Sequence, residues 1–431
     1  MLEQILRNRF RKILTGADAL ELRNNVPSPQ LLRQKFQAID ETGLYLHIPF
    51  CERICCYCPY NKEIYRADLA RQYAHAVQKE IDLYAAMIGD LPVTSFYIGG
   101  GTPTTMLDNG LPEIIRHIYE RLNMQCGIHM ESHPNHLSEK NLDKIQAMGV
   151  EYISMGVESL QDRHLRRIGR PYRTDEVIKT VRRVVRCGFR CVNADLMFTL
   201  PGQTFAEVEQ AGRILCDLGV DQVAAYPIFR FSYTQMGSSG AEKLFNLPMV
   251  IKRRKMLRIL ENIFYTAGYE RSSVWAFTKK GVAKYCSVTV PLYIGLGASG
   301  GSYLRDIFYL NTFNAKEYIK ALSGGRIPIG LSVDLSEKMQ MAGWLYWRIY
   351  ETHFNKSDFY RRFHKPLDEI YGSYLKLMNF LGFLENAGQN IVLSDRGTFW
   401  LHAFEDLFSI DYISTLWGRS KHEPWPERVT L

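Results

Sequence analysis

Residues 44–62 read LYLHIPFCERICCYCPYNK, an apolar run followed at once by a group of cysteines. Cys51, Cys55 and Cys58 stand in it with the spacing CxxxCxxC. Thiolates are the usual ligands of iron–sulfur clusters. Because three cysteines on one short loop can reach three irons of a cubane and leave the fourth iron without a protein ligand, the spacing predicts a [4Fe–4S] cluster with one open position.

The spacing alone is also compatible with two other kinds of metal site. A structural zinc ion takes four ligands, and His47 is a candidate for the fourth position. An electron-transfer ferredoxin needs a fourth cysteine, for which Cys56 is close, although its side chain is expected to point away because it directly follows Cys55. Four of the nine cysteines fall within residues 51–58, which is unlike the spread pairs of a secreted disulfide scaffold and indicates a reducing compartment.

From residue 43 onward, short apolar runs alternate with segments of helical period. This alternation predicts an α/β fold in which parallel strands are joined by helical crossovers. It suits a partial, open (β/α)6 barrel as well as a flat, doubly wound sheet, and in both the chemistry belongs at the C-terminal ends of the strands. The expected strands are residues 44–48, 93–98, 127–130, 152–157, 191–198 and 222–229, and the expected helices are residues 68–87, 111–122, 139–148, 174–187 and 205–218.

Candidate ligand-binding residues fall at these strand ends. Glycines let the backbone approach a ligand closely, and carboxylates accept hydrogen bonds from amines or ribose hydroxyls. Any single carboxylate can equally be a surface or helix-capping group. The strand-end candidates are Gly99, Gly100, Gly101, Thr102, Glu131, Glu158 and Asp195. A later loop with Gly295 and Gly297 suits either a second approach to a cofactor or a tight turn required by packing.

After about residue 330 the alternation stops. Helical patterns at residues 336–352 and 367–381 precede two short extended runs separated by a turn, at residues 382–393. Helices followed by a hairpin predict a small C-terminal α/β domain of winged-helix type. The expected domains are a helical N-terminal arm at residues 1–42, a core barrel with a second-site extension at 43–315 and the C-terminal domain at 316–431.

Composition and charge exclude several classes of protein. Hydrophobic residues make up 46% of the chain, and its net charge of +8 is not gathered into a recognisable nucleic-acid-binding module. Charged residues near the N-terminus, among them Glu3, Arg7 and Lys12, break any signal peptide. The uncharged residues 285–304 contain Pro291 and four glycines and make a poor membrane span. We expect a cytoplasmic protein with no nucleic-acid partner and no integral membrane span.

The opening stretch, together with GGGTPT at residues 99–104, resembles the radical S-adenosylmethionine (SAM) enzymes of the coproporphyrinogen-oxidase-like family. The resemblance runs from about residue 43 to about residue 300 and more weakly to the C-terminus. It implies the partial barrel and a cluster on Cys51, Cys55 and Cys58 whose open iron binds the amino and carboxylate groups of SAM. Such enzymes cleave SAM reductively to a 5′-deoxyadenosyl radical, so an electron donor such as flavodoxin or ferredoxin is an implied partner.

The resemblance also implies roles for single residues. Tyr45 matches an active-site tyrosine, and Glu158 stands where the family usually has glutamine, so both are expected catalytic residues. The expected SAM-binding residues are Gly99, Gly100, Gly101 and Thr102 at the methionine part, Glu131, Arg170 near the cofactor carboxylate, and Asp195 at the ribose. Gly295 and Gly297 match a segment that approaches a second SAM.

Three departures from the family bear on the substrate. Tyr60 stands where the oxidase has a further cysteine, residues 1–42 lack the oxidase's N-terminal Pro-Arg-Tyr-Thr-Ser-Tyr-Pro type segment, and residues 281–294 lack the His-Asn-x-x-Tyr-Trp stretch of heme chaperones. We therefore expect an oxidoreductase or methyltransferase that acts on a tetrapyrrole-type or other small molecule, by oxidative decarboxylation or by methyl (C1) transfer. The alternatives are a heme-binding chaperone with little or no turnover, a genuine oxygen-independent coproporphyrinogen III oxidase, and a structural-zinc interaction protein.

Overall fold

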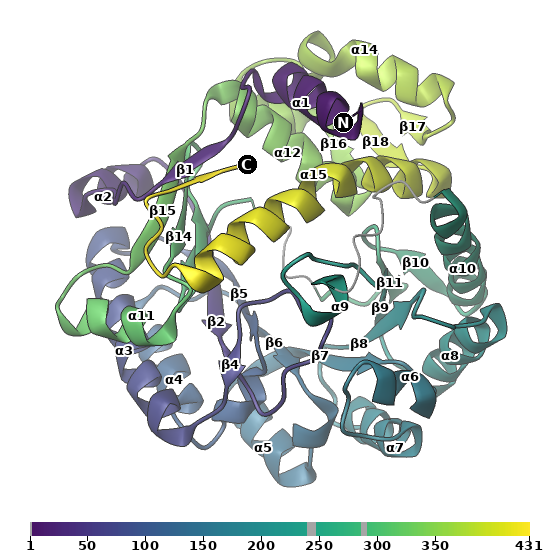
Figure 1. Ribbon diagram of the computed structural model, residues 1–431, viewed down its shortest axis with the longest axis horizontal. Helices are drawn as coiled ribbons and strands as arrows, with labels where there is room; N and C mark the ends of the chain where they lie inside the picture. Colours follow the sequence, from purple (N-terminus) through teal and green to yellow (C-terminus); the bar gives the residue numbers. More distant parts are fainter. Residues whose placement is uncertain (1, 239–246, 286–290) are drawn as a thin grey trace.

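Parallel strands joined by helices form the core of the computed structural model, which describes residues 2–238, 247–285 and 291–431. The strands lie side by side in the order in which the chain forms them (Figure 1). They are β2 (Thr42–Ile48), β5 (Val93–Gly100), β6 (Ile128–Ser132), β7 (Val150–Glu158), β8 (Cys191–Phe198) and β9 (Gln222–Pro227). Six parallel strands in chain order confirm the α/β fold expected from the alternation of apolar runs and helical segments.

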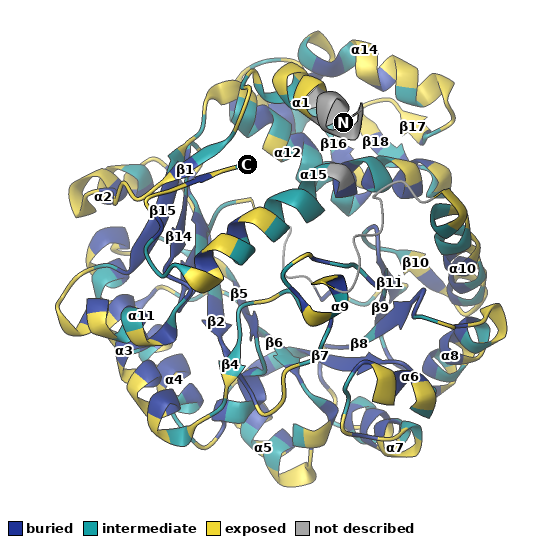
Figure 2. Cartoon of the chain, in the orientation of Figure 1, coloured by how far each residue is buried: buried dark blue, intermediate teal, exposed yellow. Residues whose placement is uncertain are grey.

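The crossover helices cover the outer side of this arc of strands (Figure 1). They are α3 (Ala67–Ile88), α4 (Leu111–Arg121), α5 (Glu139–Ala147), α6 (Asp162–Arg167), α7 (Thr174–Val185) and α8 (Phe205–Leu218). In α7, Val177, Val181 and Val184 are buried at helical spacing, so one face packs on the sheet. The strands are buried along most of their length, whereas the helices are exposed on their outward faces (Figure 2).

The sheet continues beyond the parallel strands on both sides. At one edge, β11 (Ala276–Lys279) and β10 (Tyr269–Arg271) add to β9 in antiparallel pairing. On the other side, β12 (Tyr293–Leu296) pairs in parallel with β2. Beyond it follow the antiparallel strands β13 (Gly301–Tyr303), β14 (Ile307–Asn311), β15 (Ile329–Asp334), β1 (Glu21–Arg23) and β19 (Arg428–Thr430).

One continuous sheet therefore crosses both of the domain boundaries expected from the sequence. The N-terminal arm contains the helices α1 (Leu2–Thr15) and α2 (Pro29–Gln37), but it also supplies β1 to the sheet. Residues 316–431 supply β15 and β19. The division at residues 42 and 315 stays a prediction about domains, and it does not coincide with the ends of the sheet.

The C-terminal part has a small core of its own. Its elements follow in the order helix, strand, two helices and hairpin, which is the winged-helix arrangement. They are α12 (Glu337–Glu351), β16 (His353–Asn355), α13 (Lys356–Phe363), α14 (Leu367–Phe380), β17 (Leu384–Ala387) and β18 (Asn390–Leu393). The strands form a separate three-stranded sheet, and Ile391 of β18 packs with helix side chains such as Phe359 and Leu367 in one apolar core.

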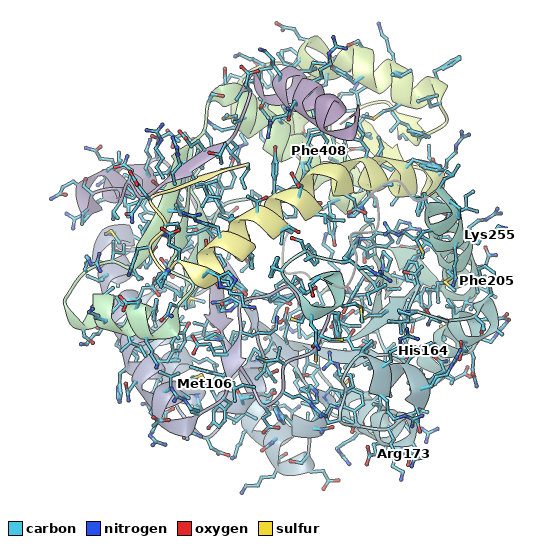
Figure 3. All side chains as sticks on the ribbon, viewed as in Figure 1. Met106, His164, Arg173, Phe205, Lys255 and Phe408 are labelled. Atoms are coloured by element: carbon cyan, nitrogen blue, oxygen red, sulfur yellow. The ribbon has the colours of Figure 1, made fainter. Side chains whose placement is uncertain are left out.

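A long helix, α15 (Asp395–His422), then returns from this part of the chain across the face of the arc of strands (Figure 1). Side chains project from α15 and from the strands into the region between them (Figure 3). The remaining elements are β3 (Phe50–Cys51), β4 (Glu63–Ile64), α9 (Gln235–Ser238), α10 (Leu247–Thr266), α11 (Ala315–Ser323) and the short 3-10 helices at Pro103–Met106 and Pro134–His136. No helix in the described ranges is both long and apolar enough to cross a bilayer.

Candidate functional site

A cavity of about 440 Å³ lies at the C-terminal ends of the parallel strands. Gly100 from β5, Glu131 from β6, Glu158 from β7 and Asp195 from β8 all line it. Cys58 of the cysteine loop lines the same cavity. The structure thus gathers candidates from four strands and from the cysteine loop, because the carboxyl ends of parallel strands meet at one edge of the sheet.

The cysteine loop brings three thiols near one another. Cys51 ends β3, and Cys55 and Cys58 follow in the loop to β4, which is closed by a hydrogen bond of 2.9 Å from the N–H of Tyr65 to the carbonyl of Cys51. Burial raises the pKa of Cys51 to about 11, a hydrogen bond from Thr102 acts against this, and the Cys58 and Cys55 thiols add to the rise. Thiolates in this loop therefore need a compensating positive charge, which iron supplies, so the donor set fits a cubane cluster.

The geometry disfavours the zinc alternative. Both ring nitrogens of His47 are engaged at 2.9 Å, Nδ1 with the Tyr45 hydroxyl and Nε2 with the carbonyl of Asn61. Cys56 lies beside Cys55 and Cys58, and its Sγ is 3.9 Å from the carbonyl of Arg167.

The glycine segment after β5 is tied to the cysteine loop by its backbone. The N–H of Gly101 donates to Ile48 at 2.7 Å, and the N–H of Thr102 donates to Phe50 at 2.8 Å. Gly100 has φ +116°, and a Cβ there would lie 2.5 Å from the ring of His47. Only glycine fits this position, because a side chain would be strained and would collide. Gly100, Gly101 and Thr102 line the cavity, whereas Gly99 is packed beneath Tyr97 and Glu131.

Two half-buried carboxylates face the cavity with their hydrogen bonds partly satisfied. Glu131 accepts hydrogen bonds from the Tyr97 hydroxyl at 2.7 Å and from the N–H of Gly100 at 3.0 Å. Asp195 accepts hydrogen bonds from the Asn193 amide at 2.8 Å and from the Ser154 hydroxyl at 3.1 Å. Burial raises the pKa of both carboxylates, and the negative charges of nearby carboxylates raise them further. A cationic ligand, or one rich in hydroxyl donors, would relieve this repulsion.

Buried polar atoms that have no hydrogen-bond partner also indicate that this cavity binds a polar ligand. The Oδ1 atom of Asn193 and the Nε atom of Arg170 are buried and have no hydrogen-bond partner, and both residues line the cavity. Such atoms are costly unless something pairs with them. An amino-acid nucleoside such as SAM carries donors and acceptors of the required kinds.

Glu158 and Arg170 form a buried ion pair at the end of β7. The Tyr226 hydroxyl donates to Glu158 at 2.9 Å, and Arg170 donates to the Tyr57 hydroxyl at 2.8 Å. Glu158 has φ +64°, an unfavourable conformation for a residue with a side chain, and such strain gathers at functional sites. Because Arg170 neutralises the carboxylate, Glu158 is not a free base in this arrangement.

Besides Gly99, Cys51 and Cys55, three further expected site residues do not line the cavity: Tyr45, Gly295 and Gly297. Tyr45 stacks on Tyr97 with ring centroids 6.1 Å apart and hydrogen-bonds to His47. Gly297 donates its N–H to the buried Glu80 at 2.8 Å, and a Cβ at Gly295 would lie 2.2 Å from the carbonyl oxygen of Gly301. These contacts favour the packing role of the glycine loop. Residues 286–290, within the stretch that lacks the chaperone motif, lie outside the described residues.

The far side of the cavity comes from residues that the sequence analysis did not single out. Trp275 and Tyr285 lie beyond the parallel strands, Tyr346 and Tyr350 come from α12, and His402, Asp406, Ile410 and Ile413 come from α15. The aromatic run WLYWRIY at residues 344–350 has a pattern that is typical of an ordinary helical core. The folding of α15 across the strands brings His402, Asp406, Ile410 and Ile413 to the cavity.

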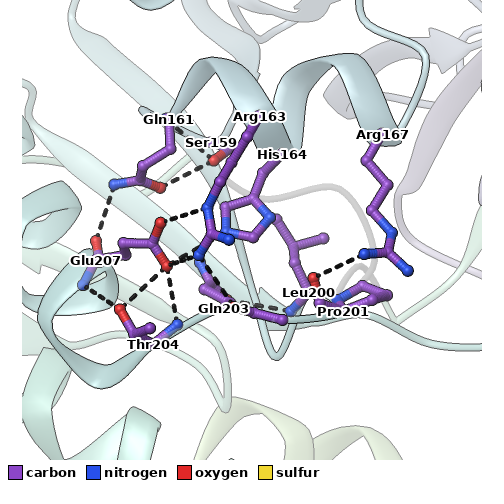
Figure 4. Close-up of polar contacts among 11 residues, drawn as sticks. Ser159, Gln161, Arg163, His164, Arg167, Leu200, Pro201, Gln203, Thr204 and Glu207 are labelled. Carbon is purple, nitrogen blue, oxygen red and sulfur yellow. Dashed lines mark hydrogen bonds and ion pairs between the residues drawn. The ribbon is translucent and has the colours of Figure 1, made fainter.

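A polar network beside the cavity fixes the segment that carries Arg170. Glu207 at the start of α8 is its centre (Figure 4). It accepts hydrogen bonds from Arg163 at 2.8 and 2.6 Å and from the N–H of Thr204 at 2.9 Å. His164 lies 3.4 Å from it. The hydrogen bonds from Arg163, above all, lower the pKa of Glu207 to about 2. Glu207 thereby ties α6 to the loop after β8.

Residues 45–215 match the family model of the Radical SAM superfamily. These residues form a radical SAM domain. Such a domain implies a [4Fe–4S] cluster and SAM, and it ends within α8. Trp275, Tyr350 and His402 therefore lie outside the radical SAM domain and belong to the rest of the chain.

Curated relatives extend over most of the chain. The heme chaperone HemW of Bacillus subtilis is 26% identical, over 82% of this chain and 95% of that protein. The anaerobilin synthase of Escherichia coli O157:H7 is 25% identical, over 87% of this chain and 86% of that protein. Among solved structures, the coproporphyrinogen III oxidase HemN of Escherichia coli, a radical SAM enzyme, matches with a TM-score of 0.76. That match covers 90% of this chain and 94% of HemN at 20% identity, so it shows the shared fold.

Proposed function

We propose that this chain is an enzyme that cleaves SAM reductively at a [4Fe–4S] cluster held by Cys51, Cys55 and Cys58. The observation that carries the proposal is the place of Cys58 in the wall of the cavity that Gly100 and Asp195 also line. Thiols for a cluster and hydrogen-bonding groups for an amino-acid nucleoside face one space. When bound, the reduced cluster supplies the electron that breaks a C–S bond of SAM and yields methionine and a 5′-deoxyadenosyl radical.

The residues around the cavity bind and orient SAM in this proposal. Gly100 and Gly101 present backbone groups to its methionine part, Glu131 accepts from its amino group, and Asp195 accepts from its ribose hydroxyls. The carboxylates also stabilise the positive sulfonium. Arg170 is proposed to receive the cofactor carboxylate through its unpaired Nε.

We propose that Glu158 is a positioning residue, since it holds Arg170 and Tyr226 by direct contacts. Tyr45 is proposed to support this site through His47 and Tyr97.

The substrate class we propose is a tetrapyrrole. The supporting observations are the names of two relatives, a heme chaperone and an anaerobilin synthase, and the aromatic wall of Trp275, Tyr346 and Tyr350, which suits a flat macrocycle. We propose one SAM in place of two, because Gly295 and Gly297 pack away from the cavity. A single SAM favours hydrogen abstraction and oxidation of the substrate over methyl transfer.

A second candidate is a heme carrier that keeps the cluster and has little turnover. The Bacillus subtilis relative, a heme chaperone that aligns over 95% of its length, favours it. We further propose an electron-transfer protein such as flavodoxin or ferredoxin as the electron donor. The proposed location is the cytoplasm, with no nucleic-acid partner. Turnover of SAM separates the enzyme from the carrier.

The cluster is tested by metal analysis of anaerobically reconstituted protein. Wild-type protein should bind about four irons per chain, from the composition of a cubane. Cys58→Ala should lose the cluster, while the matched control Cys56→Ala should retain it. Zinc in the wild-type protein, or equal loss of iron in both variants, would contradict the proposal.

A further inference from the structure

His402 and Asp406 form a buried pair of titratable groups on the side of α15 that faces the cavity. The Asp406 Oδ1 atom lies 3.3 Å from His402 Nδ1, without forming a regular hydrogen bond. The other oxygen, Oδ2, accepts a hydrogen bond of 3.1 Å from Arg253 of α10. Asp406 is therefore held from one side and directed at the imidazole from the other.

Aromatic rings fix the orientation of the imidazole. Trp275 packs edge-on against His402 with ring centroids 5.0 Å apart. The ring centroid of Tyr350 lies 5.7 Å from that of His402. The His402 side chain is only 7% exposed, and it lines the cavity. Nδ1 is buried beside the carboxylate, and no described residue forms a hydrogen bond with Nε2. Nε2 is consequently the ring atom left for a ligand.

A purely structural role explains this arrangement poorly. Burying a carboxylate and a guanidinium beside a histidine carries a desolvation cost, which ion pairing repays only in part. Arg253 belongs to the basic run at residues 252–255. Lys255 of this run points outward (Figure 3), whereas Arg253 turns inward to Asp406. His402 and Asp406 both line the cavity, where a ligand can meet them.

We propose that His402 Nε2 coordinates the iron of a heme-type macrocycle bound between α15 and the strand ends. The inference rests on the tetrapyrrole class proposed above and adds the residue that recognises its metal. A histidine that ligates a metal through one nitrogen usually turns its other nitrogen toward a carboxylate, which fixes the ring and raises its basicity. Asp406 occupies that place here. Apolar residues of the same wall, Phe229 and Ile410 among them, cover the faces of the macrocycle.

The test is a titration of the full-length, cluster-reconstituted protein with hemin, followed by difference absorbance and electron paramagnetic resonance. Wild-type protein should bind hemin and show a nitrogen-ligated ferric iron. His402→Ala should lose that signature, and added imidazole should restore it by filling the vacated space. Asp406→Asn should weaken hemin binding by about tenfold, the lower end of the loss found for such supporting groups. His422→Ala, an exposed histidine at the end of the same helix, is the matched control and should behave like the wild type.

Iron-free protoporphyrin IX separates coordination from packing. It should bind wild-type protein and His402→Ala equally, because no metal–ligand bond is involved. Identical hemin spectra for wild-type and His402→Ala protein, or no hemin binding by wild-type protein, would overturn the proposal. Formation of 5′-deoxyadenosine is measured on the same samples, so failure of heme ligation is distinguishable from failure of SAM cleavage.

Discussion

The Glu131 carboxylate accepts a hydrogen bond of 3.0 Å from the backbone N–H of Gly100 and thereby ties the ends of β5 and β6 together at the cavity. This contact holds the glycine segment with its backbone toward the place proposed for SAM. It also places a carboxylate directly beside that backbone. The same two residues thus shape the site and supply its polar groups.

Gly100→Ala should damage the site and the fold together. Gly100 has φ +116°, and the added Cβ would lie 2.5 Å from His47, so we expect a loss of about 1–3 kcal/mol in the free energy of unfolding from the backbone strain alone. SAM binding should weaken in parallel. Gly343→Ala, in the middle of α12 with no atom within 4 Å of the added Cβ, is the control and should be neutral or stabilising. Urea unfolding measures both variants, and equal stability of the two would contradict this explanation.

Asp195→Ala should weaken SAM binding by roughly 10- to 100-fold, which corresponds to about 1–3 kcal/mol for a buried hydrogen-bond partner left unpaired. Equilibrium dialysis of the reconstituted protein with labelled SAM measures the change. Asp175→Ala on the exposed face of α7 serves as the control. Unchanged affinity in Asp195→Ala would show that the ribose lies elsewhere.

Glu207 should make stability depend on pH. Its pKa is lowered to about 2 in the folded protein, whereas an unfolded glutamate has a pKa of about 4.3. A lowered folded pKa stabilises the protein above the unfolded pKa, and this contribution is lost as the pH falls from about 4.3 toward 2. Glu207→Gln should therefore be less stable than the wild type at pH 7, and the difference should shrink below about pH 5. A difference that stays constant down to pH 3 would refute the role given to this carboxylate.

Tyr60 bears on the oxidase alternative. Its side chain is 57% exposed and lines the cavity next to Cys58, where the oxidase family has a thiol. A phenol has a pKa of about 10 against about 8.5 for a thiol and is a poorer soft nucleophile. We expect little protoporphyrinogen IX when the enzyme is incubated with coproporphyrinogen III, SAM and reductant. Efficient conversion would show that the substitution is tolerated and that the chain is an oxidase.

Much of the fold was predictable because each strand and its crossover helix are encoded locally. The cysteine loop and the strand-end residues Gly100, Glu131 and Asp195 could be placed at one edge for the same reason. The far wall could not be predicted, since Arg253 and Asp406 meet across 153 residues and no local pattern records that pairing. The role of Gly295 and Gly297 was ambiguous, because the sequence does not distinguish a glycine that packing requires from a glycine that a ligand requires.

The most direct test of the central claim is the amount of 5′-deoxyadenosine formed from SAM by anaerobically reconstituted protein with dithionite. We predict that the wild type and Cys56→Ala both form 5′-deoxyadenosine and methionine, with one methionine for each 5′-deoxyadenosine. Cys58→Ala should form neither product. No cleavage by a wild-type protein that holds its full complement of iron would contradict the account and favour the heme carrier.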